Sequence, residues 1–467
     1  MWDLRGKRLL IVGLGRSGLA AARAAGARGA ALWGYDAKPA DALGAETAAL
    51  FGGGARLCAG GAEPARGMRF DALVLSPGVP ADLPFIRAAR AGGAEVIGEI
   101  EMAFRLGLGR CIAVTGTNGK TTTATLIGEI CKAAGKRTEV VGNIGTPAVS
   151  AARADAGVGS APGADADGDA ITVLELSSFQ LETIRDFRPA VSVLLNITPD
   201  HMDRHGTMER YAAAKARIFM NQRAGDFFVV NRDDAAAFAL SNACGATVVP
   251  FSRRGAAGAG AFVEDGRICA RGAAGERIDL CGADELGIPG AHNLENALAA
   301  AAACLCAGIP AAAVARALRA FTGVAHRLEL VDVIGGVRFV NDSKGTNPDS
   351  SIKAVEATAP GILLIAGGYD KHADFDAFIA SFGGKVKRLL LMGATAEKLR
   401  DAAAARGFRD AELCADLEAC VETAFRSARP GDTVLLSPAC ASWDMYTCFE
   451  ERGEHFKRCV KGIKEHA

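Results

Sequence analysis

The stretch of residues 111–123, CIAVTGTNGKTTT, constrains the fold more than any other part of the sequence. A short apolar run breaks there into a glycine turn, and a helical pattern continues to residue 134. A strand, a glycine turn and a helix in this order predict a parallel α/β unit, in which N–H groups at the helix N-terminus favour an anion. The gap between the glycines is shorter than in the usual GxxxxGK[ST] pattern, so an ordinary glycine turn before a helix is the alternative.

The residues that end this turn suit the phosphates of a nucleotide. Lys120 stands where it would reach the outer phosphates, and the Thr121 hydroxyl stands where it would bind Mg²⁺. Because the strand, the glycines, the lysine and the threonines agree with one another, we interpret the stretch as a phosphate-binding loop. Its candidate nucleotide-binding residues are Gly116, Thr117, Asn118, Gly119, Lys120, Thr121 and Thr122.

Composition excludes several classes of protein. The chain has 467 residues, more than one hydrophobic core usually serves, so we expect roughly two to three domains. Lys plus Arg and Asp plus Glu both number 53, so no overall charge attracts nucleic acid or an anionic membrane. The 13 cysteines include no CxxC pair, and no apolar run reaches the ~18 residues of a membrane-spanning helix. We therefore expect a soluble, cytoplasmic protein without integral membrane contact.

The N-terminal part has the pattern of a separate α/β unit. A short strand expected at residues 8–12, RLLIV, leads into GLGRSG at 13–18, and a helical pattern then precedes a second strand that ends at Asp36. This order is typical of a Rossmann-like opening, in which an acidic residue about 20 positions after the glycines holds a ribose or a base. GLGRSG alone is a weak signal, so a tight strand-to-helix turn without a ligand is an equally open alternative.

A second α/β unit surrounds the phosphate-binding loop, and polar residues follow its strands. Glu175 lies near the end of the strand predicted at 171–176, and His201 follows the strand predicted at 191–197. Ligands bind at the carboxyl ends of parallel strands, so Glu175 and His201 are candidate cation ligands beside Thr121. Capped or solvated loop residues are the alternative for both.

Two stretches of this central part have an open interpretation. Lys215 lies in an alanine-rich helical pattern, and the periodicity does not decide whether its side chain reaches the surface or turns inward. Residues 151–170, AARADAGVGSAPGADADGDA, read as a flexible surface insertion.

The C-terminal third again alternates strands and helices, which predicts a second doubly wound sheet. Polar strand-end residues there are expected to face a cleft shared between domains: Asp342, Lys344, Lys371 and Ser442. We therefore predict an α/β protein of three domains. They are a Rossmann-like domain over 1–108, a central phosphate-loop ATPase domain with a parallel sheet over 109–323, and a Rossmann-like C-terminal domain over 324–467.

A series of motifs spans the chain in this order: VTGTNGKTT, GNIG, LELSSFQLE, ITPDHMDRHG, GAHNLENALAA, GVAHRLE, FVNDSKGTNP, GGYDKHADF and LSPACASWD. Together they resemble the Mur ligase family along the whole length. Asn118, HMDRH and LSPACAS look like the branch that adds D-glutamate to UDP-N-acetylmuramoyl-L-alanine. The resemblance implies three domains that hold the UDP-substrate, ATP and the amino acid. It also implies a reaction in which ATP phosphorylates a carboxylate and the amine attacks the resulting acyl phosphate.

Roles of individual residues follow from this resemblance alone. It implies that Lys120 and two Mg²⁺ ions spread the charge of the transferring phosphoryl group. Thr121 and Glu175 would hold one Mg²⁺, and His201 and a carbamate on Lys215 would hold the other. The catalytic candidates are therefore Lys120, His201 and Lys215.

The resemblance also places substrate contacts. Further ATP contacts fall at Asn293, Arg327 and Asp342. The uridine end of the UDP-substrate would meet Gly15, Ser17 and Asp36, and its muramoyl end Asn143. The amino acid would meet Lys344, Thr346, Lys371, Ser442 and Phe449.

Three other functions remain to be weighed. Folylpolyglutamate synthase has a similar phosphate loop but would lack a Rossmann-like domain ahead of it, whereas here 110 residues precede the apolar run that begins at Cys111. A nicotinamide oxidoreductase that uses GLGRSG leaves Lys120 and HMDRH unexplained. A nucleotide-sensing protein without turnover would need no amino-acid pocket. We expect a monomer that binds no nucleic acid.

Overall fold

The computed structural model describes residues 2–52, 56–64, 68–153, 170–255, 260–272, 275–288, 290–370 and 373–466. The chain divides into two compact units. The first comprises Met1–Ile197, Thr207–Leu286 and Glu295–Ala320, and the second comprises Thr198–Gly206, Gly287–Leu294 and Phe321–Ala467. Lys371 and most of the predicted insertion at 151–170 lie outside the described residues. Two sheets belong to the first unit and one to the second, while the domain boundaries near 108 and 323 stay predictions.

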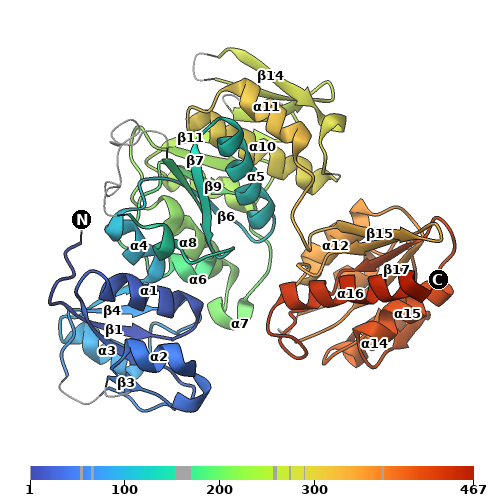
Figure 1. Ribbon diagram of the computed structural model, residues 1–467. Helices are drawn as coiled ribbons and strands as arrows, with labels where there is room; N and C mark the ends of the chain where they lie inside the picture. Colours follow the sequence, from blue (N-terminus) through green and yellow to red (C-terminus); the bar gives the residue numbers. More distant parts are fainter. Residues whose placement is uncertain are drawn as a thin grey trace. The chain divides into compact units, whose positions relative to one another are not determined.

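The N-terminal sheet has five parallel strands in the order β3-β2-β1-β4-β5 (Figure 1). The strands are β1 (Arg8–Val12), β2 (Ala31–Tyr35), β3 (Leu57–Cys58), β4 (Ala72–Leu75) and β5 (Glu95–Gly98). The helices are α1 (Arg16–Gly26), η1 (Ala40–Ala42), α2 (Gly44–Leu50), α3 (Pro84–Ala91) and α4 (Glu99–Gly107). This order matches the first five strands of the Rossmann order 3-2-1-4-5-6, so the predicted Rossmann-like opening is confirmed.

The central sheet has nine strands in the order β14-β13-β12-β11-β10-β9-β6-β8-β7. The strands are β6 (Arg110–Thr115), β7 (Arg137–Gly142), β8 (Ala170–Glu175), β9 (Val191–Leu194), β10 (Phe227–Asn231), β11 (Thr247–Ser252), β12 (Gly260–Glu264), β13 (Arg267–Arg271) and β14 (Arg277–Gly282). The helices are α5 (Lys120–Ala133), η2 (Ala148–Ala151), α6 (Ser178–Leu181), α8 (Met208–Ala216), η3 (Arg217–Phe219), α9 (Ala235–Ala239), η4 (Leu240–Ala243), η5 (Ala283–Glu285), α10 (Ala291–Cys306) and α11 (Ala311–Ala320).

The central sheet is parallel around the phosphate-binding loop but not at one edge. Strands β6 to β11 pair in parallel, as predicted, whereas β12, β13 and β14 form antiparallel pairs. The sequence reasoning did not predict these edge strands. Strand β9 also ends at Leu194, earlier than the predicted 197, because the residues after it turn toward the loop.

The C-terminal sheet has six strands in the order β15-β16-β20-β17-β18-β19, and only the edge strand β15 runs antiparallel to its neighbour. The strands are β15 (Glu329–Ile334), β16 (Val337–Asn341), β17 (Ile362–Ala366), β18 (Val386–Leu391), β19 (Ala411–Leu413) and β20 (Thr433–Leu436). Helices α12 (Pro348–Ala357), α13 (Asp376–Ala380) and α14 (Ala396–Ala405) cover one face. Helices α15 (Leu417–Ser427) and α16 (Phe449–His466) cover the other (Figure 1), and the short α7 (Met202–His205) belongs to the same unit.

Helix α4 links the N-terminal sheet to the central one through two buried carboxylates. Glu101, fully buried, accepts hydrogen bonds from the backbone N–H groups of residues 185–187 and pairs with Arg105 at 2.7 Å. Glu99 accepts one bond from the Val149 N–H at 2.6 Å, and its second oxygen has no partner among the described residues. Burial raises the pKa of Glu99 to about 7.

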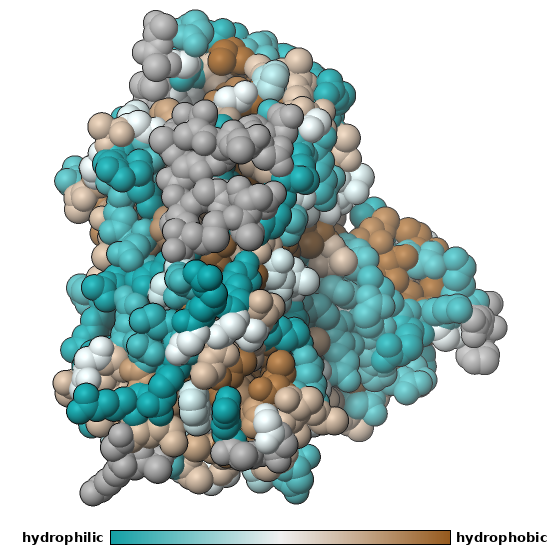
Figure 2. All heavy atoms as spheres, turned by 60° about the vertical axis from the view of Figure 1, so that its left-hand side comes forward, coloured by the Kyte–Doolittle hydropathy of each residue, from teal (hydrophilic) through white to brown (hydrophobic). Residues whose placement is uncertain are grey.

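The surface is mostly polar in the view of Figure 2, where hydrophobic residues form separate small groups. Trp443 and Tyr369 are among the exposed large hydrophobic side chains, at 61% and 44%. Among the described residues, no helix combines the length and the apolar character that crossing a bilayer requires.

We predict that Glu99→Gln removes a pH dependence of stability. The native carboxyl keeps its proton up to about pH 7, whereas the unfolded one loses it near 4.5, so the native state binds more protons between these pH values and stability falls as pH rises. The free energy of unfolding of the variant, relative to that of the wild type, should rise by up to about 3 kcal/mol between pH 5 and pH 8, measured by urea unfolding. Exposed Glu129→Gln is the matched control, and an equal effect of Glu99→Gln at both pH values would contradict the prediction.

Candidate functional site

The predicted glycine turn lies between β6 and α5, as expected. Gly116 and Gly119 have φ values of 154° and 83°, a conformation that side chains other than glycine rarely adopt. A Cβ on Gly119 would lie 2.2 Å from the Asn296 Oδ1 atom, so this position also needs glycine for space. Helix α5 begins at Lys120, and its first N–H groups face the turn.

Asn196, a residue that the sequence reasoning missed, clamps the turn from the loop after β9. Its Oδ1 accepts a bond from the Asn118 N–H at 2.8 Å, and its Nδ2 donates to the Asn118 carbonyl at 3.1 Å. Its own carbonyl accepts from the Thr117 N–H at 3.0 Å. The only signal in the sequence was an asparagine directly after a buried strand, a place typical of site residues.

Two lysines donate to carbonyls of the same turn. Lys120 Nζ lies 2.7 Å from the Thr117 carbonyl oxygen, and Lys215 Nζ lies 2.7 Å from that of Gly116. Lys215 is 1% exposed, and its Nζ lies 4.5 Å from the centre of the Tyr211 ring. The open question of its direction is thereby answered, because the side chain turns inward to the phosphate-binding loop.

Glu175 joins the start of α5 to the loop that holds Asn143. It is 1% exposed, and one of its oxygens accepts from the Thr121 hydroxyl at 2.7 Å. The other accepts from the Asn143 Nδ2 at 2.8 Å. The predicted ligands Thr121 and Glu175 are therefore neighbours with hard oxygen atoms. Within the described part of the chain, no three His, Cys, Asp or Glu side chains form a metal-binding group by themselves.

Contacts of Asp36 and Gly18 hold the N-terminal glycine turn in shape. Asp36 accepts bonds from the N–H groups of Leu14 at 2.7 Å and Lys38 at 2.9 Å. A Cβ on Gly18 would lie 1.9 Å from the Gly13 carbonyl oxygen, so close packing of the helix on the strand requires this glycine. Gly15 and Ser17 follow the carboxyl end of β1. Gly15 is exposed and Ser17 is partly exposed.

The N-terminal turn also reaches the loop after β7. The Arg16 guanidinium donates to the carbonyl of Gly145, two residues beyond Asn143. The turn that carries Gly15 and Ser17 thus contacts the loop that carries Asn143.

In the second unit, buried Asp342 pairs with partly buried Arg327 at the carboxyl end of β16. The Arg327 Nη1 lies 3.6 Å from Asp342 Oδ1, and the Ser437 hydroxyl donates to Asp342 at 2.8 Å. Burial raises the pKa of Asp342, while the Arg327 guanidinium opposes the shift. Asn293 is buried in the first turn of α10.

His201 lies on a separate loop of this unit, directly before α7. It has a left-handed backbone with φ of 55°, and its Nε2 lies 3.6 Å from Asp200 Oδ2. The His201 loop and Thr346 line a cavity of about 440 Å³. The candidate ATP-binding pair and this cavity belong to one unit.

Two of the amino-acid candidates, Lys344 and Phe449, meet at the start of α16. Lys344 Nζ lies 4.4 Å from the centre of the Phe449 ring, a cation–π contact. Ser442 is buried, and Thr346 is partly exposed. Lys371 lies outside the described residues.

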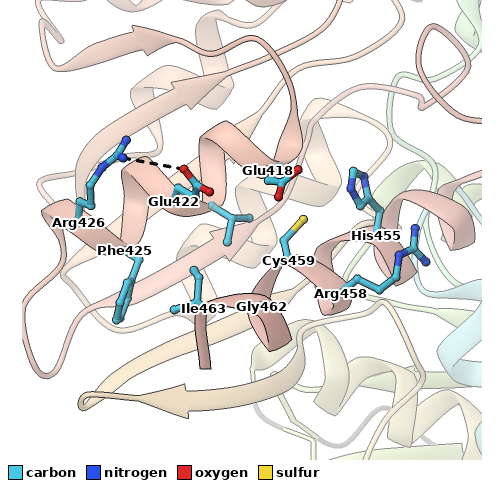
Figure 3. A pocket seen from close by; sticks show the side chains of 10 residues that line it. Glu418, Glu422, Phe425, Arg426, His455, Arg458, Cys459, Gly462 and Ile463 are labelled. Atoms are coloured by element: carbon cyan, nitrogen blue, oxygen red, sulfur yellow. Dashed lines mark ion pairs between the residues drawn. The ribbon is translucent and has the colours of Figure 1, made fainter. Parts of the chain in front are cut away.

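A groove between α15 and α16 contains none of these candidates. Figure 3 shows its lining, in which Phe425 and Ile463 lie among charged side chains such as Glu422 and Arg426. Its volume is about 520 Å³, larger than the 440 Å³ of the cavity beside His201. Cavity size alone therefore does not identify the polar strand ends as the site.

A phosphate loop in the central sheet, with a Rossmann-like sheet before it and another after it in the sequence, is typical of a nucleotide-dependent enzyme of three α/β domains, and family profiles match each part. The profile described as the Mur ligase MurD-like N-terminal domain matches residues 7–98, the Mur ligase middle domain 114–304, and the Mur ligase glutamate ligase domain 326–440. The chain belongs to the Mur ligase family. The predicted three-domain α/β fold and the predicted ligase class are thereby confirmed, and family membership supports the use of ATP.

Relatives with a high identity cover almost the whole chain. A protein of Pelotomaculum thermopropionicum named UDP-N-acetylmuramoylalanine–D-glutamate ligase is 48% identical over 463 residues, 99% of each chain. A protein of Alkaliphilus oremlandii with the same name is 52% identical over 394 residues, 84% of each chain.

Solved structures agree on the fold. The UDP-N-acetylmuramate–alanine ligase of Thermotoga maritima has a TM-score of 0.60 and 19% identity, and the match covers 99% of this chain and 100% of that chain. The E. coli FolC structure has a TM-score of 0.55 and 18% identity over 79% and 92%. At these identities the likeness concerns the fold alone.

We predict that Asn196→Ala weakens ATP binding about tenfold, because the turn loses the side chain that holds its backbone in shape. Isothermal titration with a non-hydrolysable ATP analogue measures the change. Asn242→Ala, at an exposed position of η4, is the matched control. Equal affinity of both variants would show that the turn keeps its shape without the clamp.

Proposed function

We propose that this protein is the ligase that adds D-glutamate to UDP-N-acetylmuramoyl-L-alanine, an ATP-dependent step of peptidoglycan precursor synthesis in the cytoplasm. The observation that carries the proposal is the relative of this name that is 48% identical over 99% of both chains. The turn with its two lysines and the Glu175–Thr121 pair supplies groups that suit the chemistry.

The chemistry brings anions together. The carboxylate of the UDP-substrate attacks the terminal phosphoryl group of ATP. ADP is the leaving group, and the substrate becomes an acyl phosphate. The amine of D-glutamate attacks its carbonyl carbon, and a tetrahedral intermediate collapses to the amide and phosphate. Lys120 and the N–H groups at the start of α5 are the groups of this chain that would bind the phosphates and offset the charge that develops.

The oxygen atoms of Thr121 and Glu175 fit Mg²⁺, which prefers hard ligands and would neutralise phosphate charge when bound. His201 and a carbamate on Lys215 are proposed for a second Mg²⁺. The position of Lys215 Nζ beside the phosphate-binding loop supports this idea, since a carbamate there would offer a cation two oxygens.

The remaining proposed roles are contacts of individual residues with the three substrates. Asn293, Arg327 and Asp342 would bind ATP together with the turn. Gly15, Ser17 and Asp36 would bind the uridine end of the UDP-substrate, and Asn143 its muramoyl end. Lys344, Thr346, Lys371, Ser442 and Phe449 would bind D-glutamate.

The test of this function is ADP release by the full chain. Release should require both UDP-N-acetylmuramoyl-L-alanine and D-glutamate, with L-glutamate and meso-diaminopimelate poor. Comparable turnover with all three amino acids would refute the proposal, and release without any amino acid would indicate a different class of ATPase.

Lys120→Ala should lower turnover at least about 10²-fold without unfolding the protein, because it removes a charge directed at the transferring phosphoryl group. Steady-state ADP release and circular dichroism measure the two effects. Lys132→Ala is the matched control, because Lys132 lies on the same helix but pairs with Glu129 at the surface. An unchanged rate in Lys120→Ala would leave the turn without a role in phosphate transfer.

Lys215→Ala should be nearly inactive, at least about 10²-fold slower, and a short carboxylic acid in the buffer should partly restore it. Lys215→Arg cannot form a carbamate and should not be restored. Mass spectrometry after chemical trapping of carbamates would detect the modification directly. Full activity of Lys215→Arg would rule the carbamate out.

A further inference from the structure

Arg452 is a buried charge at the amino-acid end that the proposed roles do not use. It lies in the first turn of α16 and is 1% exposed. Its Nε donates to the Ser343 hydroxyl at 3.0 Å and its Nη2 to the Ser343 carbonyl at 2.8 Å. Its Nη atoms also donate to the carbonyls of Cys440, at 3.2 Å, and Ala441, at 3.4 Å.

All these acceptors are neutral. Within the described part of the chain, no carboxylate pairs with Arg452 inside 4 Å, and Asp342 and Asp444 act on it only from a distance. Burial lowers the pKa of Arg452 to about 10, which still leaves the guanidinium charged at neutral pH. A buried cation matched only by dipoles is costly to keep, and it leaves a positive potential around it.

The acceptors belong to the two loops that carry the amino-acid candidates. Ser343 directly precedes Lys344, and Ala441 directly precedes Ser442. One guanidinium therefore spans the loop after β16 and the loop after β20, and its planar fork sets the distance between them.

The segment that follows a third strand, β17, contacts the Ala441 carbonyl, to which Arg452 also donates. The Tyr369 N–H donates to the Ala441 carbonyl at 2.9 Å. A Cβ on Gly368 would lie 2.2 Å from that carbonyl oxygen and 3.3 Å from Arg452 Nη1, so only glycine allows this approach. The ends of β16, β17 and β20 thus converge on Arg452.

Arg452 also reaches Phe449 through Ser343. The Ser343 hydroxyl accepts from Arg452 and donates to the Phe449 carbonyl at 2.8 Å, while the Phe449 ring lies under Lys344. The contacts around Lys344 consequently depend on the same guanidinium.

We propose that Arg452 is a positioning residue that sets the preference for an acidic amino acid. It holds the Lys344 and Ser442 loops together, and its charge, matched there only by neutral oxygens, favours an anionic side chain in the space these loops border. The inference rests on the proposed function and adds to it the origin of the selectivity for an acidic substrate.

The test is Arg452→Ala with chemical rescue. We expect the KM for D-glutamate to rise at least about tenfold, with the KM values for ATP and the UDP-substrate changed less than about twofold. Guanidinium at about 50 mM, far below unfolding concentrations, should lower the KM for D-glutamate again. Urea at the same concentration has the same shape without the charge and should not. Arg458→Ala, at an exposed position of α16, is the matched control.

Rescue by urea as well as guanidinium, or a parallel rise of all three KM values, would overturn the inference. If Arg452→Ala does not fold, Arg452→Lys and Arg452→Gln decide, because only the lysine keeps the charge. The KM of Arg452→Lys for D-glutamate should lie closer to the wild-type value than the KM of Arg452→Gln does. Equal KM values of these two variants would overturn the inference. If the wild type does not use D-glutamate, the proposed function fails, whereas normal wild-type turnover with an unchanged KM in Arg452→Ala overturns the inference alone.

Discussion

The clamp of Asn196 on the phosphate-binding loop is the interaction on which the central site depends. A loop that offers its N–H groups to an anion must keep them unpaired, yet its remaining polar groups still need partners. Asn196 satisfies the backbone of Thr117 and Asn118 from the side, and Lys120 and Lys215 satisfy two carbonyls. The start of α5 can therefore face a ligand while these neighbouring groups stay hydrogen-bonded.

Buried charges held by backbone dipoles recur through the structure. Lys215 donates to a carbonyl of the central site, Arg452 donates to three carbonyls of the C-terminal site, and Glu101 accepts from three N–H groups at the link between the first two sheets. Each charge removed from water costs free energy unless polar groups surround it. Each of them also ties together segments that are distant in the sequence, which gives the fold precise loops where ligands are expected to bind.

The motifs with special backbone geometry were predictable. Gly116, Gly119, Gly13 and Gly18 lie in the turns that their spacing indicated, because a positive φ or a close approach selects glycine locally. The strands before these turns are apolar runs buried on both faces, a pattern that parallel sheets impose. The antiparallel edge strands β12–β14 escaped prediction although they pair with one another as consecutive hairpins, because charged residues interrupt their apolar runs.

The sequence by itself therefore determined the three α/β sheets, the phosphate-binding turn and the polar residues at the strand ends, because these follow from local periodicity and from glycine. Only the tertiary structure decided which way Lys215 turns, that Asn196 clamps the loop, and that Arg452 joins two strand ends. Helical periodicity cannot separate a surface lysine from a buried one in an alanine-rich stretch. Hydrogen bonds between distant loops exist only once the sheet has brought the ends of its strands together.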